Sequence, residues 1–216
     1  PSAMNNMNKI GLENFNNGDF EDAIRMFKEA LLMCDMANDR ESKASVHNNI
    51  GVSYDRMNMR KSAIDNFYKA KEIFDEIGDK TSSAKMLNQV AVIEKNHVNL
   101  SGEKSALLSL ISIEEEVPDK KELLKTYNNL SINQAKTKDY ENALFTIEKI
   151  EKAAINGGMK ELLAKSYNNK GNVKFEQNLT EQAISNYKKA LELKKKIGNK
   201  KSQAITLHNI GNAYFS

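Results

Sequence analysis

Residues 164–193 read AKSYNNKGNVKFEQNLTEQAISNYKKALEL and predict two helices joined by a short polar turn. After a charged turn that contains Gly198, residues 207–211 (Leu-His-Asn-Ile-Gly) begin the same hairpin again. Gly171 and Gly211 lie 40 residues apart, and the same interval leads back along the chain to earlier copies. Every copy has a small residue at this position: Gly11, Gly51, Ala91, Ser131, Gly171 and Gly211. A fixed period of this length predicts a repeat architecture.

Three further columns recur in the second helix of each hairpin. A small residue is found at Ala23, Ala63, Ala143 and Ala183. Four residues later come Phe27, Phe67, Ile147 and Tyr187, and three beyond those come Ala30, Ala70, Ile150 and Ala190. In the third copy we take the small residue to be Ala106, three positions late, followed by Leu110 and Ile113. This predicts three extra residues near 99–102, a helix capped by Ser101, and three fewer residues around Pro118.

The order of small, small, aromatic and small positions resembles the tetratricopeptide repeat. The usual period of that family is about 34 residues, and a period of 40 is similar to the variant with longer helices. The resemblance covers nearly the whole chain, although no Trp begins a first helix and Pro118 is the only Pro near a repeat end. It implies an all-α fold, a right-handed superhelical solenoid of five helical hairpins plus one C-terminal helix.

We expect one solenoid domain over residues 5–216, and we interpret residues 1–4 as a cloning remnant. The expected repeats cover about 5–40, 41–80, 81–119, 120–159 and 160–200, with a half repeat at 201–216. The last helix has no partner after it, whereas solenoids end in polar caps. Either this helix is the cap, or the chain is a fragment of a longer protein with an effector domain; we favour the fragment.

The composition suits a thin stack of amphipathic helices, with 40% hydrophobic residues and no Trp. A net charge of +3 with 28% charged residues gives no reason to expect nucleic acid. One cysteine excludes a disulfide framework and is compatible with a reducing compartment. No apolar run approaches the roughly 20 residues of a membrane span, and no hydrophobic leader is visible. We therefore predict a cytoplasmic protein without membrane contact.

Candidates for chemistry are few. His47, His97 and His208 are at least 50 residues apart and have no Cys or carboxylate at ligand spacing, so we predict no metal site. His47 occupies an otherwise mostly apolar column and is expected to be packed. Cys34 lies on the apolar side of its helix, which favours an inert thiol. We predict no catalytic residues, no cofactor and no enzyme activity.

Asparagine marks one column of the repeat. Three residues before the small residue of each first helix stand Asn8, Asn48, Asn88, Asn128 and Asn168, with His208 in the sixth copy. The next column reads Lys9, Asn49, Gln89, Asn129, Asn169 and Asn209. Only 27 of the 216 residues are Asn, so five of five is improbable by composition alone.

The doublets Asn48-Asn49, Asn128-Asn129 and Asn168-Asn169 are similar to those of kinesin light chains and of the peptide-pheromone receptors of Gram-positive bacteria. That resemblance implies a concave groove, lined by the first helices, in which asparagines hold the main chain of an extended peptide. An amide can serve this purpose because it offers both a donor and an acceptor to a peptide unit. The alternative is that these amides bridge one repeat to the next, since buried polar groups need partners in any case.

Basic residues share this face. Lys85, Lys125 and Lys165 occupy one column, and Arg56, Lys95 and Lys136 lie further along their helices. They predict a positive groove that favours an acidic peptide or a free carboxylate; the alternative is a solvated stripe of long side chains. A run of seven lysines on a second helix and its turn is read as a solvated face: Lys188, Lys189, Lys194, Lys195, Lys196, Lys200 and Lys201.

The sequence thus predicts a protein–protein interaction module that binds an extended peptide or partner segment, as a scaffold or as the sensor part of a regulatory protein. The predicted groove residues are Asn8, Asn48, Asn49, Asn88, Asn128, Asn129, Asn168, Asn169, Lys85, Lys125, Lys165, Arg56 and Lys95. The alternative is a structural module that self-associates through its C-terminal helix and binds no peptide. Neither the partner nor the pathway can be deduced from these residues.

Overall fold

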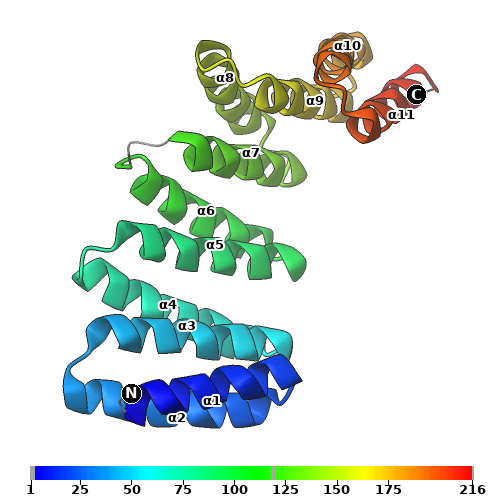
Figure 1. Cartoon of the computed structure of the whole chain (residues 1–216). Helices are drawn as coiled ribbons and strands as arrows, with labels where there is room; N and C mark the ends of the chain where they lie inside the picture. The colour runs from blue at the N-terminus through cyan, green and yellow to red at the C-terminus, as the bar shows by residue number, and fades with distance from the viewer. Residues whose placement is uncertain (1–2, 118–119, 216) are drawn as a thin grey trace. The chain divides into compact units, whose positions relative to one another are not determined.

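The structure is a computed structural model that describes residues 3–117 and 120–215, and this part of the chain forms eleven α-helices (Figure 1). Short turns join them: α1 Ala3–Asn17, α2 Phe20–Ala37, α3 Arg40–Arg56, α4 Arg60–Glu76, α5 Lys80–Asn96, α6 Leu100–Glu114, α7 Lys120–Lys136, α8 Tyr140–Asn156, α9 Lys160–Glu176, α10 Thr180–Ile197 and α11 Lys200–Phe215. The all-α fold predicted from the repeat is confirmed.

The chain divides into two compact units, with the boundary between Ile113 and Glu114. Unit 1 contains the hairpins α1–α2 and α3–α4, followed by α5 and nearly all of α6; unit 2 contains α7–α8, α9–α10 and α11. In each unit the second helix of a hairpin also packs on the first helix of the next, as α2 does on α3 and α10 does on α11. Each hairpin therefore buries its apolar face against its neighbours, which is how repeat proteins build a core.

Close packing inside the hairpins explains the column of small residues. A Cβ atom added to the glycine would come within 2.5 Å of the ring in the pairs Gly11–Phe27 and Gly171–Tyr187, and within 3.0 Å in the pair Gly51–Phe67. The two copies that carry Ala91 and Ser131 instead of glycine have Leu107 and Ile147 at the position of the aromatic ring. The first helix thus has glycine where the partner residue is an aromatic ring.

The third copy keeps the 40-residue register, so the predicted insertion is wrong. Helix α6 begins at Leu100, 40 residues after Arg60 begins α4, and a three-residue turn precedes it as it precedes α4. Asn99, not Ser101, caps α6: its Oδ1 accepts a hydrogen bond from the backbone N–H of Gly102 at 3.3 Å. Glu103 stands in the small column and is 3% exposed. The prediction failed because it took a buried carboxylate at an alanine position for a shift in register.

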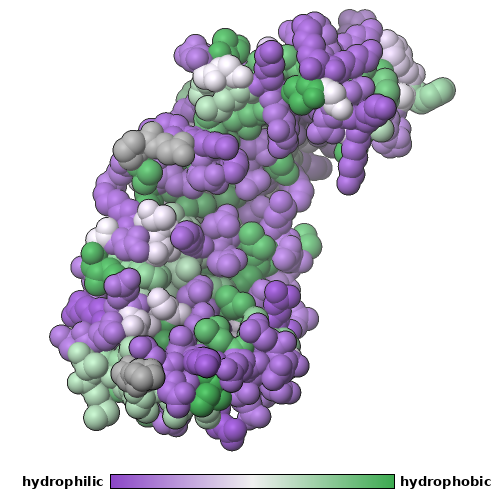
Figure 2. Space-filling model, in the orientation of Figure 1, coloured by the Kyte–Doolittle hydropathy of each residue, from purple (hydrophilic) through white to green (hydrophobic). Residues whose placement is uncertain are grey.

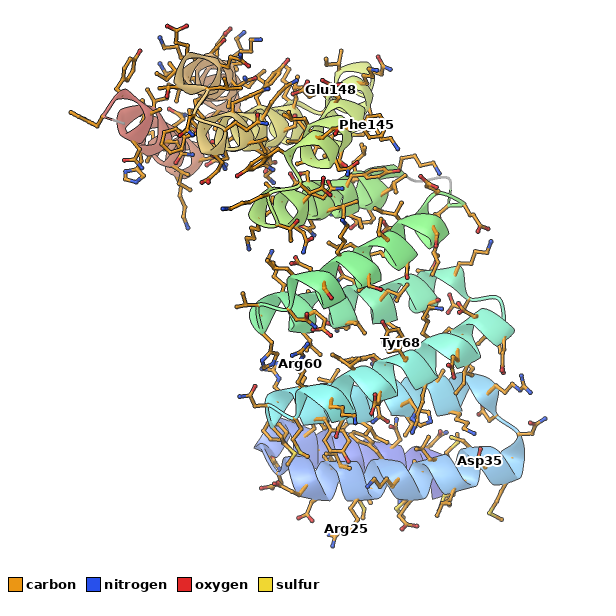
Figure 3. The ribbon with its side chains drawn as sticks, turned by 180° about the vertical axis from the view of Figure 1, so that it is seen from behind. Arg25, Asp35, Arg60, Tyr68, Phe145 and Glu148 are labelled. Atoms are coloured by element: carbon orange, nitrogen blue, oxygen red, sulfur yellow. The ribbon has the colours of Figure 1, made fainter. Side chains whose placement is uncertain are left out.

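A polar cluster surrounds this exception. Glu94 on α5 is buried, and its carboxylate accepts hydrogen bonds from Arg60 on α4 and, at 2.8 Å, from Asn99 Nδ2. Figure 3 labels Arg60 at the start of α4. A Cβ atom on Gly102 would lie 2.7 Å from the carboxyl carbon of Glu94, so glycine leaves room for that side chain. Pro118, where the compensating deletion was expected, lies outside the described residues, and α7 begins in register at Lys120.

Candidate functional site

All thirteen predicted groove residues lie on the first helices of their hairpins, α1, α3, α5, α7 and α9. Asn88 and the basic residues Lys85, Lys125, Lys165, Arg56 and Lys95 are exposed. The remaining seven asparagines are half-buried. Figure 2 shows that hydrophilic side chains dominate the visible surface. These residues are therefore in contact with solvent within each unit.

The asparagines connect successive first helices through side-chain hydrogen bonds. Nδ2 of the second-column amide donates to Oδ1 of the first-column amide 41 residues earlier: Asn49 to Asn8 at 3.1 Å, Asn169 to Asn128 at 2.9 Å, and Asn209 to Asn168 at 3.5 Å. We call the nine side chains Asn8, Asn48, Asn49, Asn88, Asn128, Asn129, Asn168, Asn169 and Asn209 the amide ladder. Part of this ladder thus bridges one repeat to the next, which was the structural alternative.

The ladder keeps unused hydrogen-bonding capacity. In the described part of the chain, the side chains of Asn48, Asn88 and Asn129 make no hydrogen bond. Asn8, Asn128 and Asn168 accept through Oδ1, and their Nδ2 groups have no partner among the described residues. A half-buried amide without a protein partner can bind water or a ligand's main chain. The bridging bonds therefore orient the amides and leave N–H groups available.

The basic residues of this face differ in how strongly they are neutralised. Lys125 Nζ lies 2.6 Å from a carboxylate oxygen of Glu122, and Lys165 Nζ lies 3.0 Å from one of Glu161. Both are exposed pairs within one helix, which add little stability. The hydrogen bond from Lys165 is the largest cause that lowers the pKa of Glu161. Two of the three lysines in the column therefore have an acidic neighbour.

Unit 2 contains a pocket of about 230 Å³ on this face. Its lining consists of Asn128 and Ile132 from α7, Lys165, Asn168 and Asn169 from α9, and Lys194 from α10. Four of these six residues belong to the predicted groove set. The pocket brings together amides from two successive repeats with two ammonium groups.

Lys194 corrects the sequence prediction, which placed it on a solvated face with the other lysines of its run. Its side chain is buried with 5% exposure, and Nζ donates a hydrogen bond to Thr206 Oγ1 at 2.6 Å. Burial lowers the pKa of Lys194, and the nearby charge of Lys165 lowers it further. The repeat could have revealed this lysine: counting back by 40 residues from position 194 leads to Ala154, Glu114, Phe74 and Cys34, a column that is otherwise mostly apolar.

A hydrogen-bond chain joins Lys194 to the amide ladder. Thr206 Oγ1 donates to Asn168 Oδ1 at 3.1 Å, and Asn209 Nδ2 lies 3.4 Å from Asn172 Oδ1. Tyr187 donates its hydroxyl to the same Asn172 oxygen at 2.9 Å. Burial is the main cause that raises the pKa of Tyr187 to about 12, and the charge of Glu176 adds to it, so the phenol remains a donor at neutral pH.

Of the residues considered for other chemistry, His47 and Cys34 are packed, whereas His97 and His208 are exposed. His47 is buried, its Nδ1 lies 3.1 Å from Asn66 Oδ1, and burial is the main cause that lowers its pKa. Cys34 is a free, buried thiol whose pKa is raised mainly by burial. Among the described residues, no group of three or more His, Cys, Asp or Glu side chains could hold a metal ion. No helix in residues 3–117 or 120–215 has the length and apolar character needed to cross a membrane.

Helical hairpins recur every 40 residues, and in three of them a glycine of the first helix faces a ring of the second. These features define the chain as an all-α helical-repeat protein. The tetratricopeptide repeat family model matches residues 2–76 and 162–216, and the chain belongs to this family. Tetratricopeptide repeats generally mediate protein–protein interactions, and the fold is typically a non-catalytic interaction module. No curated protein matches the chain in sequence.

Solved structures share the fold. A signal-transduction ATPase with a tetratricopeptide repeat sensor from Pyrococcus horikoshii aligns with a TM-score of 0.74 and 20% identity over 97% of this chain. The chain spans 32% of that protein's length. The apo form of RapI aligns with a TM-score of 0.73 and 16% identity, covering 99% of this chain and 82% of RapI. YrrB, a tetratricopeptide repeat protein with an unusual peptide-binding site, aligns with a TM-score of 0.61 and 14% identity, covering 94% and 89%.

Proposed function

We propose that the chain binds an extended peptide or partner segment along the faces of its first helices, with the amide ladder holding the main chain of the ligand. The observation that carries this proposal is the unused hydrogen-bonding capacity of the ladder, above all at Asn48 and Asn88. Within each unit, amide donors and acceptors that recur from one first helix to the next suit peptide units, whose C=O and N–H groups do not depend on the side chains. The peptide-binding site named for YrrB supports the same use of this fold.

The ladder geometry gives the proposal its physical basis. Asn8 and Asn49 fix one another through a 3.1 Å bond, which reduces the rotamer freedom that binding would otherwise have to remove. Asn48 lies beside that pair on α3, and Asn88 lies 40 residues further along on α5. Unit 1 thus offers two unpartnered amides, one on α3 and one on α5, in addition to a preoriented pair. The same proposal includes a scaffold or sensor role in a larger regulatory protein, in the cytoplasm.

The experiment selects ligands without assuming their sequence. Twelve-residue random peptides displayed on phage are panned against the full chain, and the selected peptides are synthesised for titration calorimetry. Asn48→Ala combined with Asn88→Ala should weaken binding about tenfold or more, because each lost amide contact is worth about 1 kcal/mol. The melting temperature should not fall, since neither side chain bonds to the described protein and Ala favours helix.

Two controls separate main-chain recognition from other effects. Asn142→Ala combined with Gln182→Ala removes two exposed amides from second helices and should leave affinity unchanged. A copy of the selected peptide with N-methylated backbone amides should bind more weakly than its parent. Equal affinity of the ladder variant and the wild type, or of the methylated and parent peptides, contradicts the proposal. Failure to select any peptide, together with light scattering that shows dimers, would favour the self-association alternative.

A further inference from the structure

The pocket of unit 2 contains a buried ammonium without a counter-ion. Lys194 Nζ has three N–H donors, and its hydrogen bond within the described part of the chain goes to the neutral Thr206 hydroxyl. No carboxylate among the described residues lies within ion-pair distance of it. The other ammonium of the pocket, Lys165, has Glu161 beside it. Because a buried charge without a partner is costly, a bound anion would relieve a penalty that the free protein carries.

Two of the three amides that line the pocket with Lys194, those of Asn128 and Asn168, have their acceptor occupied and their donor free. Asn168 Oδ1 accepts from Thr206 at 3.1 Å, and Asn128 Oδ1 accepts from Asn169 at 2.9 Å. In each of these two side chains the bonded oxygen Oδ1 fixes the orientation of the amide. The Nδ2 groups of Asn168 and Asn128 have no partner in the described chain. Asn169 Oδ1 remains as an acceptor that suits the N–H of a peptide unit. Two amide donors and two ammonium groups in one pocket favour a ligand group whose two oxygens share a negative charge.

From this arrangement we propose that the pocket is a carboxylate-binding subsite, in which Lys194, supported by Lys165 and the Nδ2 groups of Asn128 and Asn168, receives a carboxylate of the bound peptide. This inference rests on the proposed function and names the residue that gives it chemical selectivity. The carboxylate belongs either to an Asp or Glu side chain or to the peptide's C-terminus. Ile132 supplies an apolar wall for the carbon atoms that carry the group.

The subsite is specific to one junction of the repeat. At the position of Lys194, earlier copies carry Cys34, Phe74, Glu114 and Ala154. Cys34, Phe74 and Ala154 offer no positive charge to an anion, and the carboxylate of Glu114 would repel one. The repeat therefore fixes where along the ladder a carboxylate would be held, and so the register of the peptide.

Three small probes test the subsite on the full chain. N-acetyl-glycyl-glycine carries a C-terminal carboxylate, and N-acetyl-aspartyl-glycinamide carries a side-chain carboxylate. N-acetyl-asparaginyl-glycinamide is the uncharged match of the second probe and the uncharged reference for both. NMR spectra of lysine ε-CH₂ and asparagine side-chain amide groups follow each titration. At least one carboxylate probe should shift the signals of Lys194, Asn128 and Asn168 with an affinity about tenfold or more above that of the uncharged probe. The probe that binds more tightly identifies the source of the carboxylate.

Variants give the decisive comparison. Lys194→Met should weaken carboxylate binding about tenfold or more, read from the asparagine amides. Lys194→Arg should keep most of it, and Lys195→Met, an exposed neighbour, should keep all of it. Equal shifts from all three probes, or carboxylate binding that survives Lys194→Met, overturn the subsite. If the uncharged probe still shifts Asn128 and Asn168 in that case, the proposed peptide binding stands without the subsite. Failure of the proposed function itself is seen in a separate measurement: the selected peptides would bind the Asn48→Ala, Asn88→Ala variant as tightly as the wild type.

Discussion

Units 1 and 2 fill the same junction between hairpins with different kinds of side chain. The junction pairs a residue near the end of a second helix with one twelve positions later in the next first helix. In unit 1 the pairs are Cys34 with Val46 and Phe74 with Met86; in unit 2 they are Glu114 with Thr126, Ala154 with Ser166, and Lys194 with Thr206. All ten side chains are buried. Unit 1 thus uses the junction for apolar packing, whereas unit 2 places two ionisable groups there.

The difference separates stability from binding. Burying an apolar side chain contributes about 1.5–3 kcal/mol to folding, while burying a charge without a counter-charge costs free energy. Unit 2 gives up part of the stability that the repeat offers, and at Lys194 it gains an ammonium next to the amide ladder. Such a loss of stability is common where a side chain is needed for function. The three predictions below test this contrast at Phe74, Lys194 and Glu114.

The largest effect is expected at the apolar junction of unit 1. Phe74→Ala should lower the free energy of unfolding by about 3–5 kcal/mol, because it removes a ring that is 6% exposed and leaves a cavity. Urea unfolding followed by circular dichroism measures this change. Phe145→Ala is the matched control, since this ring on α8, labelled in Figure 3, is 59% exposed and should cost less than about 1 kcal/mol. Equal losses in the free energy of unfolding of the two variants would show that the junction has no special packing role.

The charged junction should respond in the opposite direction. Lys194→Met keeps most of the side-chain volume, removes the buried charge, and should raise the free energy of unfolding by about 1–2 kcal/mol at pH 7. The pKa of Lys194 is lowered, chiefly by burial and then by Lys165, so its contribution to stability is complete above the unfolded value of about 10.4 and is lost as the pH falls. The advantage of the variant should therefore shrink as the pH rises towards 10.4.

The groups that face Lys194 bear on this test. Lys165 and Glu161 on α9 line the same region, and Thr206 on α11 accepts its hydrogen bond. Lys195→Met provides the control for a lost surface charge and should change stability by less than about 0.5 kcal/mol. A Lys194→Met variant that is less stable than the wild type at pH 7 would show that the lysine stabilises the junction. The contrast between the units would then fail.

Much of the fold could be predicted from the sequence because the repeat carries redundant information. Three copies agree on where glycine meets a ring, and a contact such as that of Gly171 with Tyr187 explains both columns. The third copy was misread because it has Glu103 where the others have Ala, and the sequence alone does not show that a carboxylate can be buried there. Next to Glu103, Gly102 leaves room for the carboxyl group of Glu94, which is a contact that the sequence alone does not show.

The candidate site could be predicted only in part. The Asn column located the ladder on the first helices, because a 40-residue period carries each residue to the same face. Its hydrogen bonds could not be predicted, since whether Asn169 bonds to Asn128 depends on the spacing of helices α7 and α9. Lys194 was missed because a run of lysines normally indicates solvent. Its column, not its neighbours in sequence, contained the signal.

The smallest effect is expected at the acidic junction. Glu114 sits at the end of α6; burial is the largest cause that raises its pKa, Glu122 adds to it, and a hydrogen bond with Thr126 opposes it. Oε2 of Glu114 is buried without a partner among the described residues. The nearby Lys120 ammonium donates to the backbone oxygens of Glu114, Glu115 and Val117 and not to this carboxylate. Glu114→Gln removes the charge and keeps an acceptor for Thr126. It should raise the free energy of unfolding at pH 7 by about 1 kcal/mol.

The stability advantage of Glu114→Gln should change with pH in the opposite direction to that of Lys194→Met. A carboxyl group whose folded pKa is raised contributes its full stability below the unfolded value of about 4.3, and this contribution is lost as the pH rises through the folded pKa. The advantage of Glu114→Gln should therefore be near zero at pH 4 and grow towards pH 7, in contrast to the decline for Lys194→Met towards pH 10.4. Urea titrations at pH 4, 5.5 and 7 measure it, with Glu115→Gln, an exposed neighbour that accepts from the Tyr127 hydroxyl, as control. An advantage that is constant across this range would mean that Glu114 does not bear a buried charge, and only Lys194 would then distinguish the junctions of unit 2 electrostatically from those of unit 1.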